Sequence, residues 1–133
     1  MADIRQGPWG GGNQFLKALS KELQKNALLS SSLLKSDVVL VNSHHWRKKL
    51  WQLLLWRLLR PRGVILHRID GPISLVRGTA ASRFVDRRIA LFSRLVSDGA
   101  VFQSLWSQSQ SVKLGITHHR SVVILNDPDD DVF

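Results

Sequence analysis

Four short apolar stretches alternate with segments of helical periodicity, and this alternation constrains the fold more than any other feature of the sequence. The stretches lie at 38–41, 64–66, 100–102 and 122–125. Each is continuous rather than alternating, which is typical of strands whose two faces are both buried in a parallel sheet. Strands that alternate with helices are joined by right-handed crossovers. We therefore predict an α/β fold, a single Rossmann-like domain over residues 1–133 with a doubly wound parallel sheet.

The strands are expected near 38–42, 64–67, 100–103 and 122–125, and helical patterns fill the gaps between them. The first helix places Phe15, Leu16, Leu19 and Leu23 on one face and has Asn13 as its predicted N-cap. A later helix is marked by Phe84, Ile89, Leu91, Phe92 and Leu95, and the last runs from Leu105 to Leu114 and ends at Gly115. A strand at Ile4, ahead of the first helix, is only a weak candidate because its surroundings are short and polar.

The helix predicted from Trp46 to Leu59, within the basic segment from Trp46 to Arg62, is the most unusual of the set. On a helical projection Trp46, Leu50, Trp51, Leu53, Leu54 and Leu58 form a broad apolar arc, which Arg57 interrupts, while Trp56 falls among the polar residues. One interpretation is a buried crossover helix. The other is peripheral contact with an anionic membrane, because the segment is also strongly basic.

Charge and composition narrow the classes of function. The formal net charge is +9, and four of the ten acidic residues stand in the last seven positions, so the rest of the chain is more basic still. Such a surplus attracts polyanions but does not select among them. Disulfides and thiolate metal sites are excluded because there is no cysteine. No apolar run is long enough to span a bilayer and none resembles a signal peptide, so we expect a cytoplasmic protein, with peripheral contact at the inner face of the membrane as a further option.

In a parallel α/β sheet the ligand crevice lies beyond the carboxyl ends of the strands. The glycine-rich segment 7–13 precedes the first helix, where it could bring backbone N–H groups to an anion or could simply form a tight turn. It matches neither a phosphate-binding Walker loop nor a dinucleotide fingerprint. His44 follows the first strand, and could act as an acid or base or be purely structural. Arg68 and Asp70 follow the second strand, as a simple ion pair or as ligand contacts. A hydrolytic triad of Ser104, His67 and Asp70 is not expected, because no nucleophile elbow is present.

Read in order, these segments resemble the N-terminal domain of glycosyltransferase family 4, which has the GT-B fold. The matching runs are Gly-Pro-Trp-Gly-Gly-Gly-Asn-Gln-Phe at 7–15, Asp-Val-Val-Leu-Val-Asn-Ser-His at 37–44, His-Arg-Ile-Asp-Gly-Pro at 67–72, Asp-Gly-Ala-Val-Phe-Gln-Ser at 98–104 and Val-Ile-Leu-Asn-Asp-Pro-Asp-Asp-Asp-Val-Phe at 123–133. The first strand of the family pattern is nearly missing. The family's nucleotide-sugar domain with its Glu-x7-Glu motif is also missing, since the only glutamate is Glu22.

The resemblance implies a glycosyltransferase-like protein, the acceptor-side half of an enzyme that takes sugar from a nucleotide sugar to a glycan or lipid-linked acceptor. By analogy, His44 and Asp70 would be catalytic. The donor or substrate would contact Gly10, Gly11, Gly12, Asn13, Arg68 and Ser104, and no metal or other cofactor is implied. We expect the chain to be a truncated or split form that is inactive without a second domain.

An alternative is a non-enzymatic basic module that binds an anionic membrane surface or nucleic acid. Basic residues do cluster at 47–49 and 57–62. Specific nucleic-acid recognition is not expected, because none of the standard motifs for it is present.

Overall fold

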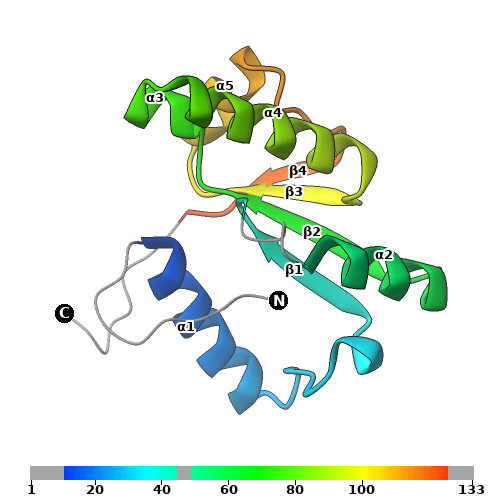
Figure 1. The fold of residues 1–133 in the computed structure, drawn as a ribbon. Helices are drawn as coiled ribbons and strands as arrows, with labels where there is room; N and C mark the ends of the chain where they lie inside the picture. The colour runs from blue at the N-terminus through cyan, green and yellow to red at the C-terminus, as the bar shows by residue number, and fades with distance from the viewer. Residues whose placement is uncertain (1–10, 45–48, 126–133) are drawn as a thin grey trace.

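The computed structural model describes residues 11–44 and 49–125, which form an α/β fold (Figure 1). The elements run in the order α1 (Gly11–Lys25), a 3-10 turn η1 (Leu33–Lys35), β1 (Val38–Asn42), α2 (Leu50–Leu59), β2 (Val64–Ile69), α3 (Ile73–Arg77), α4 (Ala80–Leu95), β3 (Gly99–Phe102), α5 (Leu105–Lys113) and β4 (Ser121–Val123). Gly10 and the segment 45–48 lie outside the described residues, as do the weak strand candidate at Ile4 and residues 126–133.

All four described strands are parallel and stand in the order β1-β2-β3-β4. The register pairs Val38 with Val64 and Leu66 with Gly99 across the first two strand pairs. The four strands lie within three residues of where the sequence places them, so the prediction of a parallel sheet is confirmed. The fold is consistent with a Rossmann-like arrangement.

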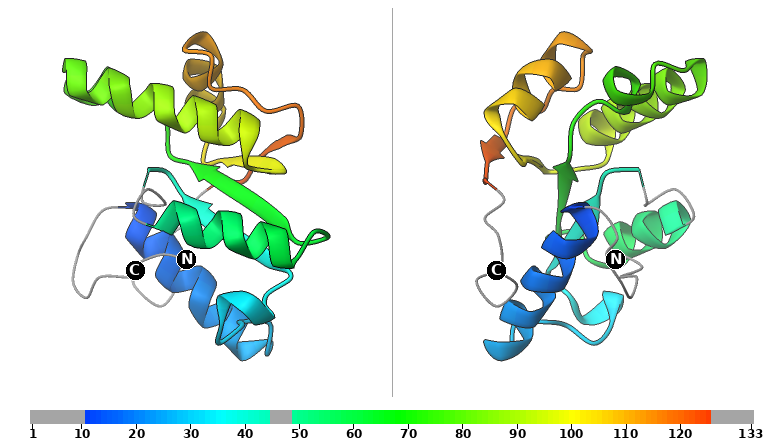
Figure 2. Two further views of the ribbon diagram at one scale, coloured as in Figure 1. Left: turned by 45° about the vertical axis from the view of Figure 1, so that its right-hand side comes forward. Right: turned by 90° about the vertical axis from the view of Figure 1, so that its left-hand side faces the viewer.

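Helices α2 and α4 cover one face of the sheet, whereas α1 lies against the other (Figure 2). Alternation of side chains along β2 explains this division, because Ile65 and Ile69 point toward α2 and α4 while Arg68 points toward α1. The first core cluster joins β1 and β2 to Leu53 and Trp56 of α2 and Phe92 of α4. A second cluster joins the other end of β2 and β3 to Ile89 of α4. The α1 side is less completely covered, as half-exposed Val64 and Val122 show.

The predicted apolar arc does not coincide with the buried side of α2. Leu53 and Trp56 are the buried residues of this helix, with Leu50 packed beside them, while Trp51 is 64% exposed and Leu58 77% exposed. The helix is apolar on nearly every side, so a helical projection cannot decide which side faces the sheet. Trp56 sets the rotation of α2 about its axis, because its large ring fills the space over β1 and β2.

Arg57, which interrupted the predicted arc, binds across to neighbouring elements. Its guanidinium donates to the backbone oxygen of Gly63 at 2.6 Å and to the Asp98 carboxylate at 2.5 Å. Asp98 also accepts from the backbone N–H of Ile65. The charge that looked misplaced on α2 therefore ties this helix to the beginnings of β2 and β3.

The helix marked by five apolar residues is confirmed as α4, in which Ile89 and Phe92 are buried while Phe84, Leu91 and Leu95 are each more than half exposed. Asn13 lies inside the first turn of α1 and is not its N-cap. The helix from Leu105 is confirmed, with Ser104 as its N-cap. No helix in the described ranges is long and apolar enough to cross a membrane.

Candidate functional site

The carboxyl ends of β1, β2 and β3 meet around the buried guanidinium of Arg68. Arg68 is the penultimate residue of β2. Its side chain is 1% exposed and points toward α1. It donates to the Asn42 Oδ1 atom at the end of β1 at 2.8 Å, to the Asp70 carboxylate, and to the Gln103 Oε1 atom after β3 at 3.3 Å. Asn42, Arg68, Asp70 and Gln103 are called the Arg68 cluster below.

Helix α1 closes one side of the Arg68 cluster. The Arg68 Cζ atom lies over the Phe15 ring, 4.2 Å from its centroid, which is a cation–π contact. One turn earlier, Gly12 approaches the cluster so closely that an added Cβ would lie 3.1 Å from Asn42 Nδ2 and 3.2 Å from Asp70 Oδ2. Gly12 therefore allows the amino end of α1 to reach the polar groups at the end of the sheet.

Asp70 is the member of the Arg68 cluster that can meet a ligand. Its side chain is 34% exposed, whereas that of Arg68 is 1% exposed. Arg68 holds one carboxylate oxygen, Oδ1, and the other lies toward Gly12. The backbone oxygen of Asp70 accepts from Gln103 Nε2 at 2.5 Å, which fixes the loop after β2. A fixed, partly exposed carboxylate is suited to accept hydrogen bonds from hydroxyl groups.

Ser104 follows Gln103 and is half-buried. Its hydroxyl oxygen accepts from the backbone N–H of Ser107 at 3.0 Å and so caps α5. The hydroxyl proton is not used in that bond. The predicted contact of Ser104 with substrate stays a prediction, and the structure adds a capping role that accounts for the residue by itself.

His44 lies in the turn directly after β1 and is exposed. The turn begins at Ser43, whose φ of 45° is in the left-handed region that non-glycine residues rarely adopt. The amide of Ser43 donates to the Arg68 backbone oxygen at 2.7 Å, which holds this conformation. His44 therefore leaves the same end of the sheet that carries Asp70, although none of its described contacts joins it to the Arg68 cluster.

His67 lies on the opposite face of β2 and takes no part in a triad with Asp70 and Ser104. It is fully buried, its Nε2–H donates to the Ser43 backbone oxygen at 2.9 Å, and its ring packs edge-on against Phe92. The Nδ1 atom has no hydrogen-bond partner among the residues that the structure describes. Burial lowers the pKa of His67 from 6.5 to about 4, so the ring is neutral at pH 7.

The sequence-predicted residues thus separate into three groups. Arg68 and Asp70 belong to the Arg68 cluster with Gly12 directly beside it, and Ser104 and His44 lie at the same end of the sheet. Gly11 and Asn13 belong to the first turn of α1 beside Gly12, and Gly10 lies outside the described residues. Asn42 and Gln103 are also polar residues at the ends of strands, but the sequence alone does not assign them a role in the site. Phe15 gave no signal, because its contact with Arg68 depends on the position of α1.

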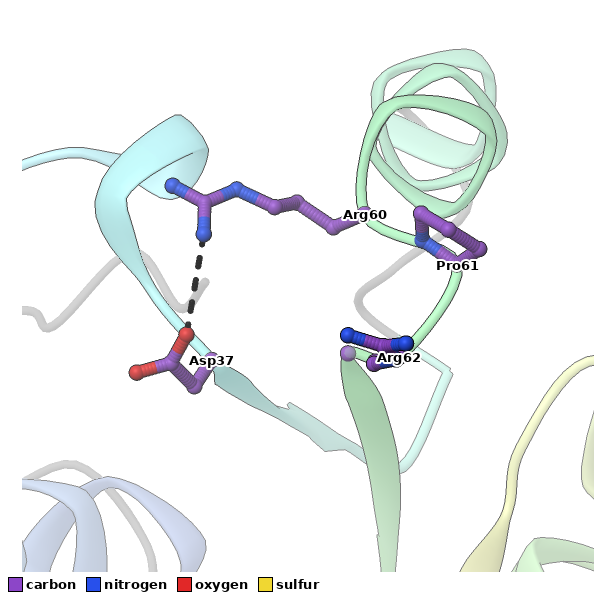
Figure 3. Close-up of a pocket in the computed structure, with 5 residues that line it drawn as sticks. Asp37, Arg60, Pro61 and Arg62 are labelled. Atoms are coloured by element: carbon purple, nitrogen blue, oxygen red, sulfur yellow. Dashed lines mark ion pairs between the residues drawn. The ribbon is translucent and has the colours of Figure 1, made fainter.

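Two hollows lie away from this end of the sheet. One of about 350 Å³, at the amino ends of β1 and β2, is lined by Asp37 and residues 60–63 (Figure 3). Its walls are the connection from α2 to β2 and the exposed Arg60–Asp37 ion pair, whose Nη1 and Oδ1 atoms are 3.7 Å apart. In the described part of the chain no group of three or more His, Cys, Asp or Glu side chains could hold a metal ion. The Arg68 cluster, with its buried polar network, is therefore the better candidate site.

No protein-family model matches the sequence, and neither curated proteins nor solved structures give a significant match. We therefore infer function from the geometry of the Arg68 cluster and from the resemblance of the motifs.

Proposed function

We propose that this protein is the acceptor-side half of a glycosyltransferase, in which the Arg68 cluster binds a hydroxyl-rich acceptor. The observation that carries the proposal is the position of Asp70, a partly exposed carboxylate at the carboxyl end of a parallel sheet, where ligands bind in this class of fold. Arg68 orients this carboxylate, and Asn42 and Gln103 orient Arg68 in turn.

The chemistry of the Arg68 cluster favours a neutral sugar over a phosphate. The Asp70 carboxylate already faces the first turn of α1, where an anion would otherwise bind, and like charge would oppose a diphosphate there. Sugar hydroxyls can donate to a carboxylate without that repulsion. In the proposed reaction Asp70 or His44 accepts the proton of the acceptor hydroxyl. The hydroxyl oxygen bonds to the anomeric carbon of the donor, and the nucleoside diphosphate leaves.

The donor requires a second domain in this proposal. The described sheet offers one wall of a cleft, and a developing diphosphate charge needs preorganised donors shielded from water. Gly10, Gly11, Gly12 and Asn13 are proposed to approach the sugar of that donor from the amino end of α1, because the Asp70 carboxylate opposes the diphosphate there. The second domain would supply the remaining contacts, on this or on another polypeptide.

Binding tests the acceptor site directly. Saturation-transfer NMR of the purified chain with a panel of mono- and disaccharides should show contact with at least one sugar. Asp70→Asn should weaken that contact at least about tenfold, as expected when a charged hydrogen-bond acceptor is lost. Asp37→Asn is the matched control, because Asp37 has a 90% exposed side chain at the other end of the sheet. Equal binding by the two variants would overturn the assignment of Asp70.

Turnover tests the half-enzyme part of the proposal. The folded chain is mixed with a panel of nucleotide sugars and acceptors, alone and together with a separately expressed nucleotide-sugar-binding domain. We expect no turnover by the chain alone. Robust transfer by the chain alone would show that no second domain is needed, and would overturn this part of the proposal without touching the sugar-binding result.

A further inference from the structure

Helix α2 presents an apolar side to solvent and cannot turn it inward. Trp56 and Leu53 occupy the core, and Arg57 is bound to Gly63 and Asp98. These contacts fix the rotation of the helix about its axis. The opposite side therefore points outward, with Trp51, Leu54, Leu55, Leu58 and Leu59 between 46% and 77% exposed.

Helix α4 covers the same face of the sheet as α2 (Figure 2), and its outer side is also apolar. Its inner side is fixed by Ile89 and Phe92, and Phe84, Leu91 and Leu95 point outward at 55%, 55% and 75% exposure. A row of arginines, at positions 83, 87, 88 and 94, accompanies them. The outer sides of α2 and α4, with these eight apolar residues and four arginines, are called the α2–α4 face below.

The α2–α4 face carries positive charge without exposed negative charge. The sequence of α2 contains no acidic residue, and the only one in α4 is Asp86. Asp86 is 4% exposed and accepts from the backbone N–H groups of Ile73 and Ser74 at the start of α3. Apart from this buried carboxylate, every charged residue of the two helices is an arginine.

We propose that the α2–α4 face docks on an anionic lipid bilayer. Helices that lie on a membrane combine leucine and tryptophan on the side that enters the headgroup region with Lys and Arg that meet lipid phosphates. The α2–α4 face has both components, held by the fold in one orientation. The proposal concerns the surface alone and does not depend on glycosyl transfer.

Charge complementarity selects the membrane over two other occupants. A second copy of the chain docked through the same face would bring four more arginines to the interface and no exposed carboxylate of α2 or α4 to pair with them, which is repulsive. A nucleic acid would satisfy the arginines but would leave the leucines of α2 without an apolar partner. An anionic bilayer satisfies the cations at its phosphates and the leucines at the acyl boundary.

The primary test is co-sedimentation of the full chain with vesicles. Phosphatidylcholine vesicles are compared with vesicles that contain phosphatidylglycerol. We expect binding to the anionic vesicles and little to the neutral ones. Trp51→Glu with Leu58→Glu should reduce the partition coefficient more than about tenfold, because both apolar insertion and charge attraction are lost. The control pair Leu28→Glu with Val112→Glu makes the same charge change at residues that are 71% and 51% exposed outside this face.

The arginines can be tested separately from the apolar residues. Arg87→Gln with Arg94→Gln should lower binding to anionic vesicles by about fivefold for each arginine removed. Residual binding to neutral vesicles should not change. Equal losses in the α2–α4 variants and in the control pair would mean that net charge alone governs binding, and would overturn the proposal.

Site-specific labelling shows which surface meets the lipid even where a variant folds poorly. The chain has no cysteine, so Leu58→Cys, Leu91→Cys and Leu28→Cys can each carry one environment-sensitive fluorophore. On anionic vesicles, labels at 58 and 91 should shift to the blue and the label at 28 should not. A shift at 58 and 91 without lipid, together with a dimeric mass in solution, would identify the face as an interface between copies and overturn the proposal. A shift at 28 alone would also overturn it.

Discussion

Arg68 shows how a single buried charge can organise one end of this sheet. An isolated buried cation is costly, and Arg68 is retained because Asn42, Asp70 and Gln103 accept its N–H groups and Phe15 covers its face. The same contacts join three strands and α1 at the candidate site. Arg68 therefore orients Asp70 and is itself too deeply buried to be the main ligand contact.

Removing the charge of Arg68 should destabilise the fold. Arg68→Ala leaves the acceptors of the cluster without a donor, so we expect the free energy of unfolding to fall by about 3 kcal/mol, at the low end for a broken buried pair because Asp70 is partly exposed. Arg60→Ala is the control, because Arg60 forms an exposed ion pair with Asp37 and should cost at most about 1 kcal/mol. Urea denaturation measures both values. Similar losses for the two variants would contradict the structural role assigned to Arg68.

The buried His67 side chain should make the folded protein less stable as the pH falls. Its pKa is about 4 in the folded protein and about 6.5 in the unfolded chain, so the unfolded chain takes up the proton first as the pH falls. Stability from this residue is complete above about pH 6.5 and declines between pH 6.5 and pH 4, by roughly 3 kcal/mol in total. The physical cause is the buried ring, whose Nδ1 atom has no described partner for an added proton.

The pH dependence can be assigned to His67 by substitution. Urea denaturation between pH 4 and pH 7.5 should give a flatter stability profile for His67→Gln than for the parent protein, even if the variant is less stable at every pH. His119→Gln is the control, because His119 is exposed. An unchanged slope in His67→Gln would assign the acid sensitivity to other groups.

At the scale of elements, the packing of α2 depends on the absence of a side chain at Gly63. A Cβ atom added there would lie 2.4 Å from Trp56 Cη2, a distance at which something must move. Gly63→Ala should therefore displace Trp56 or the α2–β2 connection and cost roughly 1–3 kcal/mol, the range for overpacking a core. Gly11→Ala is the control, since nothing lies within 4 Å of its added Cβ. Thermal unfolding followed by circular dichroism compares the two, and equal midpoints would contradict this account of α2.

The same helix shows where prediction from sequence succeeds and where it fails. The strands were predictable because each is a continuous apolar run bounded by polar residues, even though Val64 and Val122 on the α1 side are only half-buried. The rotation of α2 was not, because leucine and tryptophan surround it and the partner of Arg57 is Asp98, 41 residues away. At the candidate site the positions of Arg68 and Asp70 followed from the strand ends. The contact of Phe15 with Arg68 could not be predicted, because it depends on where α1 lies against the sheet.

At the scale of the whole molecule, the described sheet has two outer strands, β1 and β4, with no further described strand beside them. Next to β4 the sheet face on the α1 side is hollowed, and Val64, Leu66, Val101, Val122 and Ile124 are among the residues that line it. An unpaired strand edge beside exposed apolar residues is a template for association between chains. The β4 edge is therefore the expected starting point of aggregation.

One substitution distinguishes association through the β4 edge from association through exposed apolar residues in general. Val122→Lys places a charge on β4, where it should obstruct edge-to-edge pairing, and stability should change little because Val122 is 50% exposed. Val112→Lys makes the same change on α5 at 51% exposure, away from any strand edge. Light scattering over a concentration series at a fixed temperature below unfolding should show delayed aggregation for Val122→Lys only. If both variants aggregate like the parent protein while Trp51→Glu with Leu58→Glu does not, association proceeds through the α2–α4 face and the β4 edge is not its starting point.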